Sequence, residues 1–526
     1  MFKRVLIANR GEIAIRIARA AAALGVESVS VHAPVDALSL HTRATTLTRP
    51  IGGGTDPVRA YLDIDALIEA ARDTGCDCVH PGYGFLAENA EFARRCLAED
   101  LAFIGPAPET LALFGDKVRS RELARQVGVP VVPGSHTALA NAEAAREVAG
   151  KLGYPVMLKA SAGGGGRGMR RVETGPEMAE AFARCRGEAE AAFGDGALFV
   201  EKLILRPRHI EVQVLGDGHG GLVHLYERDC SVQLRNQKVV EIAPAPGLEP
   251  ELRQRLWDDA LALAKAASYV NAGTVEFLVD PGLGERYFIE CNPRIQVEHT
   301  VTELVTGVDL VEAQFRIAAG ERLEDLGLAG QAAVPPPRGY AVQARVTATG
   351  AGTITGYREP AGPGVRVDSC GYLGLSPPPQ FDPMFAKVIG ASAGSLAAAL
   401  ARTSRALAEF QIAGLPTNLA ALIAILDRPE LAAGDARTTL LAEHPELMAA
   451  TDPAPAPARA LLDQRQAALG GGRPALPASL LAAASLEVHD GEAGVECPMA
   501  GSVVELTVAA GASVAAGDTL LVVSAM

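Results

Sequence analysis

Residues 287–300 read YFIECNPRIQVEHT, and polar and apolar residues alternate along this stretch without a break. Successive side chains of an extended chain point to opposite faces, so the alternation predicts a strand with one apolar and one polar face. The polar face carries Glu290, Asn292, Arg294, Gln296 and Glu298. A solvated strand face would show the same pattern. The mixture of carboxylates and amides with an arginine favours a site for Mg²⁺, phosphate and a small anion.

The segment before this stretch predicts a hairpin. GTVEFLVD places Glu276 on another apolar strand, and residues 280–285, DPGLGE, have the composition of a turn. Antiparallel pairing would bring Glu276 beside Glu290 and Asn292. Two carboxylates and an amide oxygen would then be available to hold Mg²⁺ against nucleotide phosphates.

The composition predicts a globular chain of several domains. Its 526 residues suffice for three or four domains, and 48% of them are hydrophobic. The net charge of −14 argues against non-specific nucleic-acid binding, so local Lys and Arg clusters must meet any anionic substrate. Eight scattered cysteines favour reduced thiols. With only the short apolar run VLIA near the start, we expect a cytoplasmic protein without a signal peptide or membrane span.

Residues 1–115 alternate between strand-like and helical patterns. This order predicts an open α/β domain, a parallel sheet with crossover helices. Residues 80–89, HPGYGFLAEN, end one of these strands in a Gly/Pro turn at the edge where such sheets bind ligands. A plain surface turn explains that segment equally well.

A glycine run follows the apolar strand that Lys159 closes. Residues 163–166 are four consecutive glycines, whose N–H groups can approach phosphates closely, and Lys159 adds a cation. The run is not a P-loop, because no Gly-Lys-Ser/Thr follows. A flexible loop is the alternative, although the flanking strands favour nucleotide binding.

Two later segments predict contacts with a nucleotide and with an anion. LFVEKLI is a buried strand whose end, Glu201 to Ile204, is suited to present backbone groups to an adenine ring. His209 shares a strand face with Glu211 and Gln213, although a lone histidine is more often a surface residue. CSVQLRNQKVVE sets Gln233, Arg235 and Lys238 in a short basic loop suited to an anion.

The ordered motifs resemble biotin carboxylase, an ATP-grasp family. They are NRGEIAIRIARA, HPGYGFLAEN, GDK, KASAGGGGRGM, EKLI with PRHIEVQVL, ERDCSVQLRNQKVVE, GTVEF and IECNPRIQVEH. PMAGSV near the end is similar to the front half of a biotinyl carrier domain, so the chain resembles the N-terminal part of a biotin-dependent carboxylase. The implied divisions are an N-terminal domain at 1–115, an ATP-grasp domain at 116–335 with a lid at about 131–204, an α+β C-terminal domain at 336–446, an Ala/Pro/Gly-rich linker at 447–492 and a partial β carrier domain at 493–526.

The resemblance implies that ATP and bicarbonate form carboxyphosphate and that CO₂ then passes to N1′ of biotin. Phosphates would be held by Lys117, Lys159, Gly165 and Gly166. The rest of the nucleotide site would comprise Glu201, Lys202, Leu203, Ile204, His209, Gln233 and Asn236. Glu276, Glu290 and Asn292 would bind Mg²⁺ or Mn²⁺. Bicarbonate would contact Lys238, Arg294, Gln296 and Val297, Glu298 would deprotonate it, and Arg345 would stabilise the biotin enolate.

The spacing of the anion site adds a structural expectation. Arg294 and Glu298 are four residues apart, about 13 Å along a strand that rises roughly 3.3 Å per residue. Both can touch one bicarbonate only if the strand bends after Arg294. Pro293 is a plausible place for the regular ladder to fail.

Three departures from the family pattern affect the expectations. Asn236 stands where many members have His, so one nucleotide contact loses a possible charge. VTATGAGTITGY after Arg345 is closer to long single-chain acyl-CoA carboxylases, so we expect the first half-reaction of an acetyl- or acyl-CoA carboxylase. The sequence ends at Met526, before the Lys that carries biotin in the family. We therefore expect biotin on another chain or segment, and poor packing of residues 495–526.

The resemblance also implies partners. These are a biotinylated carrier domain, a carboxyltransferase domain or subunit, and a second copy of the chain in a homodimer or larger assembly. Two alternatives stay open: another ATP-grasp ligase, against which QVEH and Arg345 argue, and a non-catalytic ATP-binding assembly module. The final carboxyl acceptor is not identified by the sequence.

Overall fold

The computed structural model describes residues 1–450 apart from 53, 55, 136, 162–168 and 281, and three pieces of the tail, 502–509, 511–515 and 519–524. The first 115 residues contain a parallel sheet in the order β3-β2-β1-β4-β5, so the predicted open α/β domain is confirmed. Its strands are β1 (Arg4–Ile7), β2 (Glu27–His32), β3 (Leu47–Pro50), β4 (Cys78–His80) and β5 (Ala102–Phe103). Its helices are α1 (Gly11–Ala23), η1 (Pro34–Asp36), η2 (Leu40–Arg43), α2 (Pro57–Ala60), α3 (Ile64–Asp73), α4 (Ala90–Ala98) and α5 (Pro108–Gly115).

The turn at residues 80–89 lies at the carboxyl edge of this sheet. β1 and β4 are neighbouring parallel strands, so the segments that follow them leave the sheet at the same edge. Asn9, just after β1, donates from Nδ2 to the carbonyls of Pro81 at 2.7 Å and Tyr83 at 2.8 Å. The turn is therefore pinned against the N-terminal segment.

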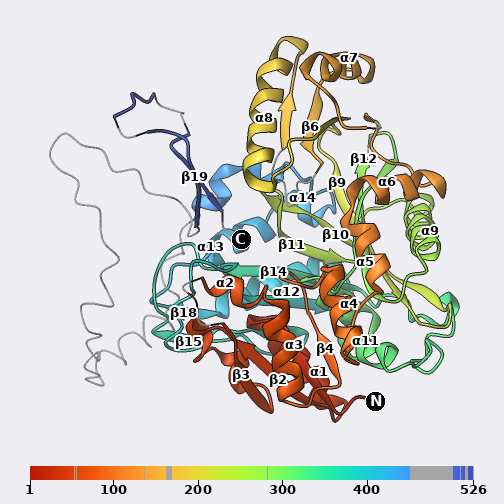
Figure 1. Cartoon of the computed structure of the whole chain (residues 1–526), viewed down its shortest axis with the longest axis vertical. Helices are drawn as coiled ribbons and strands as arrows, with labels where there is room; N and C mark the ends of the chain where they lie inside the picture. The colour runs from red at the N-terminus through yellow and green to blue at the C-terminus, as the bar shows by residue number, and fades with distance from the viewer. Residues whose placement is uncertain are drawn as a thin grey trace.

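A larger antiparallel sheet lies at the centre of the molecule, between the N-terminal domain and the upper lobe (Figure 1). Its order is β13-β12-β9-β10-β11-β14-β17-β16 within the described residues. The strands are β9 (Arg208–Gly216), β10 (Leu222–Leu234), β11 (Gln237–Ala243), β12 (Asn271–Asp280), β13 (Glu285–Asn292), β14 (Tyr340–Thr347), β16 (Val365–Ser369) and β17 (Met384–Ser392). Strands from both sides of the predicted 335/336 boundary thus share one sheet, and the domain boundaries stay predictions.

Apolar faces of helices cover this sheet. Leu256 and Leu263 of α9 pack with Val212 and Val275 of the sheet in one buried cluster. The helices beside the sheet are α9 (Pro250–Ala266), α10 (His299–Thr306) and α11 (Leu310–Ala318), with η4 at Gln331–Ala333. The helices that follow β17 are α12 (Leu396–Glu409), α13 (Leu419–Leu426), α14 (Pro429–Ala432), α15 (Leu440–Glu443) and η5 (Pro445–Ala449). A small two-stranded sheet pairs β15 (Gly356–Arg358), which lies between β14 and β16 in sequence, with β18 (Gln411–Ala413).

The upper lobe has a sheet and core of its own (Figure 1). Its strands are β6 (Val156–Ala160), β7 (Met169–Val172) and β8 (Leu198–Lys202), in the order β7-β6-β8. Its helices are α7 (Ala142–Leu152), η3 (Gly175–Glu177) and α8 (Met178–Phe193), and α6 (Lys117–Gln126) precedes the lobe. Leu158 and Val200 pack there with Phe182 in a cluster separate from the core of the central sheet.

The described part of the tail exposes apolar side chains. β19 (Ser502–Leu506) pairs with β20 (Leu521–Ser524), and the side chains of Val503, Leu506 and Val514 are exposed. This agrees with the prediction of poor packing, although residues 495–501, 510, 516–518 and 525–526 lie outside the described residues. No helix among the described residues is both long and apolar enough to span a membrane.

The central stretch corrects one prediction. β13 ends at Asn292 and α10 begins at His299, so a continuous strand through Glu298 is wrong. Pro293 has no N–H to continue the ladder, and the N–H of Arg294 bonds back to the carbonyl of Asn292 at 2.9 Å. The chain therefore turns next to Pro293, as the spacing of Arg294 and Glu298 required.

Candidate active site

The β12–β13 hairpin pairs the predicted metal carboxylates. Glu276 stands directly opposite Glu290, and Asn292 pairs opposite Thr274. Asn292 donates from Nδ2 to Glu276 Oε1 at 2.8 Å. The predicted antiparallel pairing is confirmed, and the role of these residues as metal ligands stays a prediction.

Lys238 connects the metal carboxylates to the predicted base. Its Nζ lies 2.6 Å from Glu211 Oε2, 2.8 Å from Glu276 Oε1 and 2.7 Å from Glu298 Oε1. Burial alone would lower the pKa of Lys238, but these three carboxylates hold it well above its usual value. A permanently charged ammonium thus lies between three acidic groups.

Glu298 is completely buried and ionised. Besides Lys238, it accepts a hydrogen bond from Arg345 Nη2 at 3.0 Å. Burial opposes its charge, yet Lys238 and Arg345 hold the pKa of Glu298 far below the usual range. Arg345 is oriented from its other side by Glu241, whose Oε1 lies 2.5 Å from Nε.

Glu276 and Glu290 have opposite electrostatic environments. Burial would raise the pKa of Glu276, but Lys238 and His209 hold it well below its usual value. Burial and the charge of Glu276 raise the pKa of Glu290, which the charge of Lys117 offsets only in part. A divalent cation suits this pair, because adjacent carboxylates repel one another and are the oxygen ligands that Mg²⁺ prefers.

The segment after Pro293 presents the predicted bicarbonate contacts. Arg294 donates from Nη1 to Gln296 Oε1 at 2.9 Å, and its Nε lies 2.8 Å from Glu88 Oε1. Gln296 Nε2 is buried and has no partner among the described residues. An amide donor next to a guanidinium is a suitable cradle for a small oxyanion. Glu88 shows that the turn at residues 80–89 belongs to this site.

His209 contacts a predicted metal ligand and a predicted nucleotide contact. Its Nε2 is 2.7 Å from Glu276 Oε2, and its Nδ1 is 2.6 Å from Gln233 Nε2. Because the amide nitrogen of Gln233 donates to Nδ1, the imidazole proton resides on Nε2 and is donated to Glu276. His209 therefore orients a predicted metal ligand.

The predicted basic loop is the tip of a hairpin. Gln233 pairs with Lys238 across β10 and β11, and only Arg235 and Asn236 form the turn. Their φ angles are +50° and +67°, and asparagine is among the residues that tolerate this left-handed region best. The hairpin projects Lys238 toward the carboxylates and leaves Asn236 at its tip.

The upper lobe holds the other predicted nucleotide contacts. Lys159 Nζ lies 2.6 Å from Glu201 Oε2, and Arg121 pairs with the other oxygen of Glu201. Lys202 donates from Nζ to the Gly153 carbonyl at 2.8 Å, so its ammonium is engaged within the lobe. The N–H groups of Lys202 and Leu203 also bond within the protein, to the carbonyls of Pro133 and Pro155. Gly165 and Gly166 lie outside the described residues.

Three family models match successive parts of the chain. They are biotin carboxylase, N-terminal domain, over residues 1–111; carbamoyl-phosphate synthase L chain, ATP binding domain, over 116–326; and biotin carboxylase C-terminal domain, over 342–443. A solved relative is the biotin carboxylase domain dimer of Hydrogenobacter thermophilus 2-oxoglutarate carboxylase with MgADP, ADP and bicarbonate. Its TM-score is 0.81 and its identity 42%, over 86% of this chain and 99% of that one. The chain belongs to the biotin carboxylase family.

Other relatives are enzymes much longer than the part that this chain matches. Pyruvate carboxylase 1 of Caenorhabditis elegans is 50% identical over 455 residues, and mitochondrial pyruvate carboxylase of Homo sapiens is 47% identical over 454. The matches cover 85% of this chain but only 38% of either relative. A biotin carboxylase domain of a single-chain bacterial carboxylase is 48% identical, with a TM-score of 0.77, and the match covers 85% of this chain and 98% of that one.

These findings confirm the predicted fold class and the predicted enzyme class. The chain is an ATP-grasp ligase of the biotin carboxylase family, whose reaction uses ATP, magnesium and bicarbonate and whose carboxyl acceptor is biotin. The expectation of an acetyl- or acyl-CoA carboxylase stays a prediction, and the relatives named above include two pyruvate carboxylases and a 2-oxoglutarate carboxylase. The roles of individual residues also stay predictions.

Sequence reasoning missed several residues of this biotin carboxylase site. Glu211 and Arg228 are both fully buried and form an ion pair at 2.5 Å, and Arg228 also reaches Gln213 at 2.8 Å. Glu241 behind Arg345 was missed as well. The signal was present in β9, where Glu211 shares the polar face of His209, but the partners come from strands distant in sequence.

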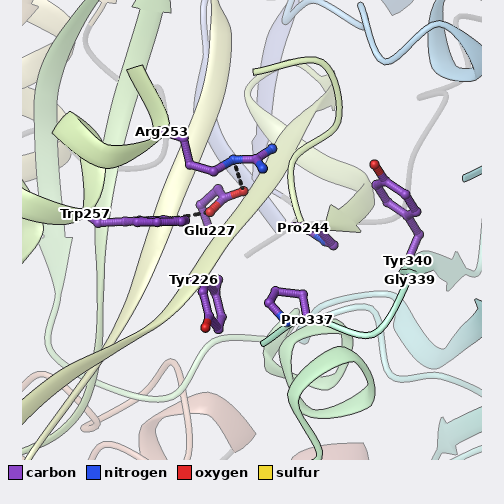
Figure 2. A pocket seen from close by; sticks show the side chains of 8 residues that line it. All are labelled: Tyr226, Glu227, Pro244, Arg253, Trp257, Pro337, Gly339 and Tyr340. Carbon is purple, nitrogen blue, oxygen red and sulfur yellow. Dashed lines mark hydrogen bonds and ion pairs between the residues drawn. The ribbon is translucent and has the colours of Figure 1, made fainter. Parts of the chain in front are cut away.

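A well-formed pocket elsewhere in the biotin carboxylase fold is not this site. Figure 2 shows the side chains that line it, which come from β10, the residue after β11, α9, the loop before β14 and the start of β14. Its volume is about 320 Å³. It is lined by Tyr226, Glu227, Pro244, Arg253, Trp257, Pro337, Gly339 and Tyr340. The Glu227 carboxylate there is occupied by the Trp257 indole at 2.7 Å, the Ala245 N–H at 3.2 Å and Arg253 Nε at 3.1 Å. The one carboxylate among the lining residues is therefore already engaged.

Proposed function

We propose that this chain carries out the first half-reaction of a biotin-dependent carboxylase with the residues described above. ATP phosphorylates bicarbonate, and the resulting carboxyphosphate delivers CO₂ to N1′ of biotin on a carrier domain. The observation that carries the proposal is the position of Lys238, within 2.8 Å of Glu211, Glu276 and Glu298. One ammonium thus joins the metal end of the site to the base.

In the first step, a bicarbonate oxygen attacks the γ-phosphorus of ATP and ADP leaves. Arg294 and the free Gln296 Nε2 would hold the anion, and Lys238 would exchange a carboxylate contact for one of its oxygens. Glu298 takes the bicarbonate proton. Its base strength rises when Lys238 turns to the substrate, because one of its two cations then no longer favours the ionised form.

Glu276, Glu290 and Asn292 would hold the magnesium ion, which neutralises charge on the transferred phosphoryl group when bound. Lys117, whose charge reaches Glu290, would contact the same phosphates from the start of α6. Lys159 would contribute from the upper lobe. These groups position ATP, and positioning with charge neutralisation supplies most of the catalysis of phosphoryl transfer.

In the second step, carboxyphosphate breaks into CO₂ and phosphate. Phosphate removes the N1′ proton of biotin, and the enolate that forms attacks CO₂. Arg345 is suited to stabilise the developing negative charge, because Glu241 fixes its guanidinium at the edge of the same cluster. Loss of Arg345 should therefore affect biotin carboxylation more than ADP formation.

A rate measurement tests the proposal. We expect the chain to release ADP from MgATP only when bicarbonate is present, and free biotin to stimulate that release. Release without any bicarbonate dependence would favour another ATP-grasp ligase, one that joins an amine to a different carboxylate. No ATP turnover at all would favour a non-catalytic assembly module.

The partners belong to the same proposal. A biotinylated carrier domain would deliver biotin, and a carboxyltransferase would move the carboxyl group onward to an acceptor that stays unassigned. Two copies of the chain would form a homodimer, which is supported by the dimer of the 2-oxoglutarate carboxylase domain. A cytoplasmic location stays a prediction.

A further inference from the structure

Lys387 on β17 is a buried cation outside the predicted site. Its side chain is 0% exposed, and its Nζ donates to the Val297 carbonyl at 3.0 Å. The same Nζ lies 3.0 Å from Glu12 Oε1 on α1 and 3.9 Å from Asp368 Oδ2 on β16. One ammonium thus connects residues 294–298, the bicarbonate segment, to two parts of the chain that are distant in sequence.

The hydrogen bond of Lys387 has a geometric consequence. A carbonyl and the next N–H of a trans peptide point in opposite directions. The Val297 carbonyl faces Lys387, so the Glu298 N–H points away from it. His299 Nδ1 likewise binds the Gln296 carbonyl at 2.7 Å, so the Val297 N–H of that peptide points away from His299.

These two N–H groups donate to no protein group within the described residues. They follow Gln296, whose Nε2 is also a buried donor without a partner there. Adjacent unpaired N–H groups form a concavity suited to an anion. Lys387 and His299 therefore bind the carbonyl groups of Val297 and Gln296, and the N–H groups of the same two peptides point away from these side chains.

The placement of Lys387 is electrostatically demanding. It stands directly opposite Arg345 on β14 and opposite Asp368 on β16. Two cations opposite one another across strands repel, and burying an ammonium is unfavourable without counter-charges. Glu12 and Asp368 supply those charges, and the Tyr83 hydroxyl donates to the same Oε1 of Glu12. An apolar residue would fill this position at lower cost if packing alone were required.

We propose that Lys387 is a positioning residue for the bicarbonate segment: it fixes the Val297–Glu298 peptide so that the backbone donors and the Glu298 carboxylate meet the anion. This inference rests on the proposed function. Lys387 does not touch the substrate and acts through the Val297 carbonyl. Its removal should weaken bicarbonate binding selectively, with little change in the use of ATP.

The test separates this role from a purely structural one. Lys387→Met leaves the Glu12 carboxylate with no cation within hydrogen-bond distance and is expected to destabilise the fold. The double variant Lys387→Met with Glu12→Gln removes both charges at nearly constant volume and should restore stability. Arg286→Met is the matched control, because it breaks the partly buried pair with Asp259, 2.9 Å away, outside the site.

The readout is bicarbonate-dependent ADP release, with KM measured separately for bicarbonate and ATP. We expect the double variant to raise the KM for bicarbonate about tenfold, as for loss of one charged hydrogen bond, and to leave the KM for ATP within about twofold. Arg286→Met should lower Tm without changing either KM.

Two outcomes would overturn the inference. One is a folded double variant with the KM for bicarbonate of the unsubstituted chain; the other is a parallel rise of both KM values. A chain whose unsubstituted form shows no bicarbonate-dependent ADP release would instead overturn the proposed function, and this inference with it.

Discussion

The bicarbonate side and the nucleotide side of the site are built differently. On the bicarbonate side Glu298, Lys238 and Arg345 come from the central sheet and the turn beside it, and both cations contact Glu298. On the nucleotide side Lys159 and Glu201 belong to the separate sheet of the upper lobe. The first group is positioned by one sheet, whereas the position of the second depends on a lobe with its own sheet and core.

This difference has a functional meaning. Buried groups with satisfied partners are preorganised, so the bicarbonate side can stabilise charge with no rearrangement beyond the exchange of one Lys238 contact. A lobe that closes over ATP would exclude water and protect carboxyphosphate from hydrolysis. Substitutions on the bicarbonate side should therefore reduce kcat or raise the KM for bicarbonate, and substitutions in the upper lobe should mainly raise the KM for ATP.

The largest effect is expected for Glu298→Gln. The amide cannot accept the bicarbonate proton, so kcat for ADP release should fall by about 10²–10⁴-fold, the range for loss of a general base. Glu227→Gln is the matched control, because Glu227 is also fully buried in the central sheet but lies at the pocket of Figure 2. If both variants lost equal activity, the role of Glu298 as the base would be refuted.

Glu290→Gln tests the metal end. Removing this carboxylate should weaken Mg²⁺ binding by about 100-fold, the upper end of effects seen around metal sites. Titration of ADP release with Mg²⁺ at saturating ATP measures the effect. Unchanged magnesium dependence would show that Glu290 is not a ligand.

The raised pKa of Glu290 adds a pH dependence. Without metal, the folded state binds this proton more tightly than the unfolded state, so the stability it contributes is present at low pH and is lost as pH rises through the folded pKa. Mg²⁺ replaces the proton, so the rise in Tm caused by Mg²⁺ should grow from about pH 5 to about pH 8. Thermal unfolding with and without Mg²⁺ measures it, and Glu290→Gln should flatten the trend.

An intermediate effect is expected in the upper lobe. Lys159→Met should raise the KM for ATP about tenfold through loss of one charged contact, with the KM for bicarbonate unchanged. Lys151→Met is the control, because Lys151 forms only an exposed pair with Glu147 on α7. A rise in the KM for bicarbonate would mean that the two sides are not separable.

The smallest effect is expected for Asn236→His. Asn236 has a φ of +67°, a conformation that histidine also adopts more readily than most residues, so the hairpin should persist. We expect the KM for ATP to change by no more than about threefold. A larger improvement would reveal a direct nucleotide contact at the hairpin tip.

Local patterns in the sequence predicted much of this architecture. The alternation of strands and helices predicted the parallel sheet, and the hairpin turn at 280–285 predicted the pairing of Glu276 with Glu290. The spacing of Arg294 and Glu298 predicted the turn beside Pro293. Each of these features is set by neighbours within a few residues or by one hairpin.

Long-range contacts were beyond this reasoning. Glu211, Glu276 and Glu298 converge on Lys238 from three other parts of the chain, which only the strand order brings together. Glu88 reaches Arg294 across two domains, and Lys387 reaches Val297 in the same way. No local sequence pattern predicts such contacts, because they depend on the register of strands that are far apart in sequence.

Transfer of labelled oxygen tests the central claim most directly. If a bicarbonate oxygen attacks the γ-phosphorus, bicarbonate labelled with heavy oxygen must leave one labelled oxygen in each phosphate released, and free biotin should be carboxylated at the same time. Mass spectrometry of the phosphate is predicted to show that label in the unsubstituted chain. Unlabelled phosphate released together with ADP would mean that water, not bicarbonate, is the nucleophile, and would contradict the account.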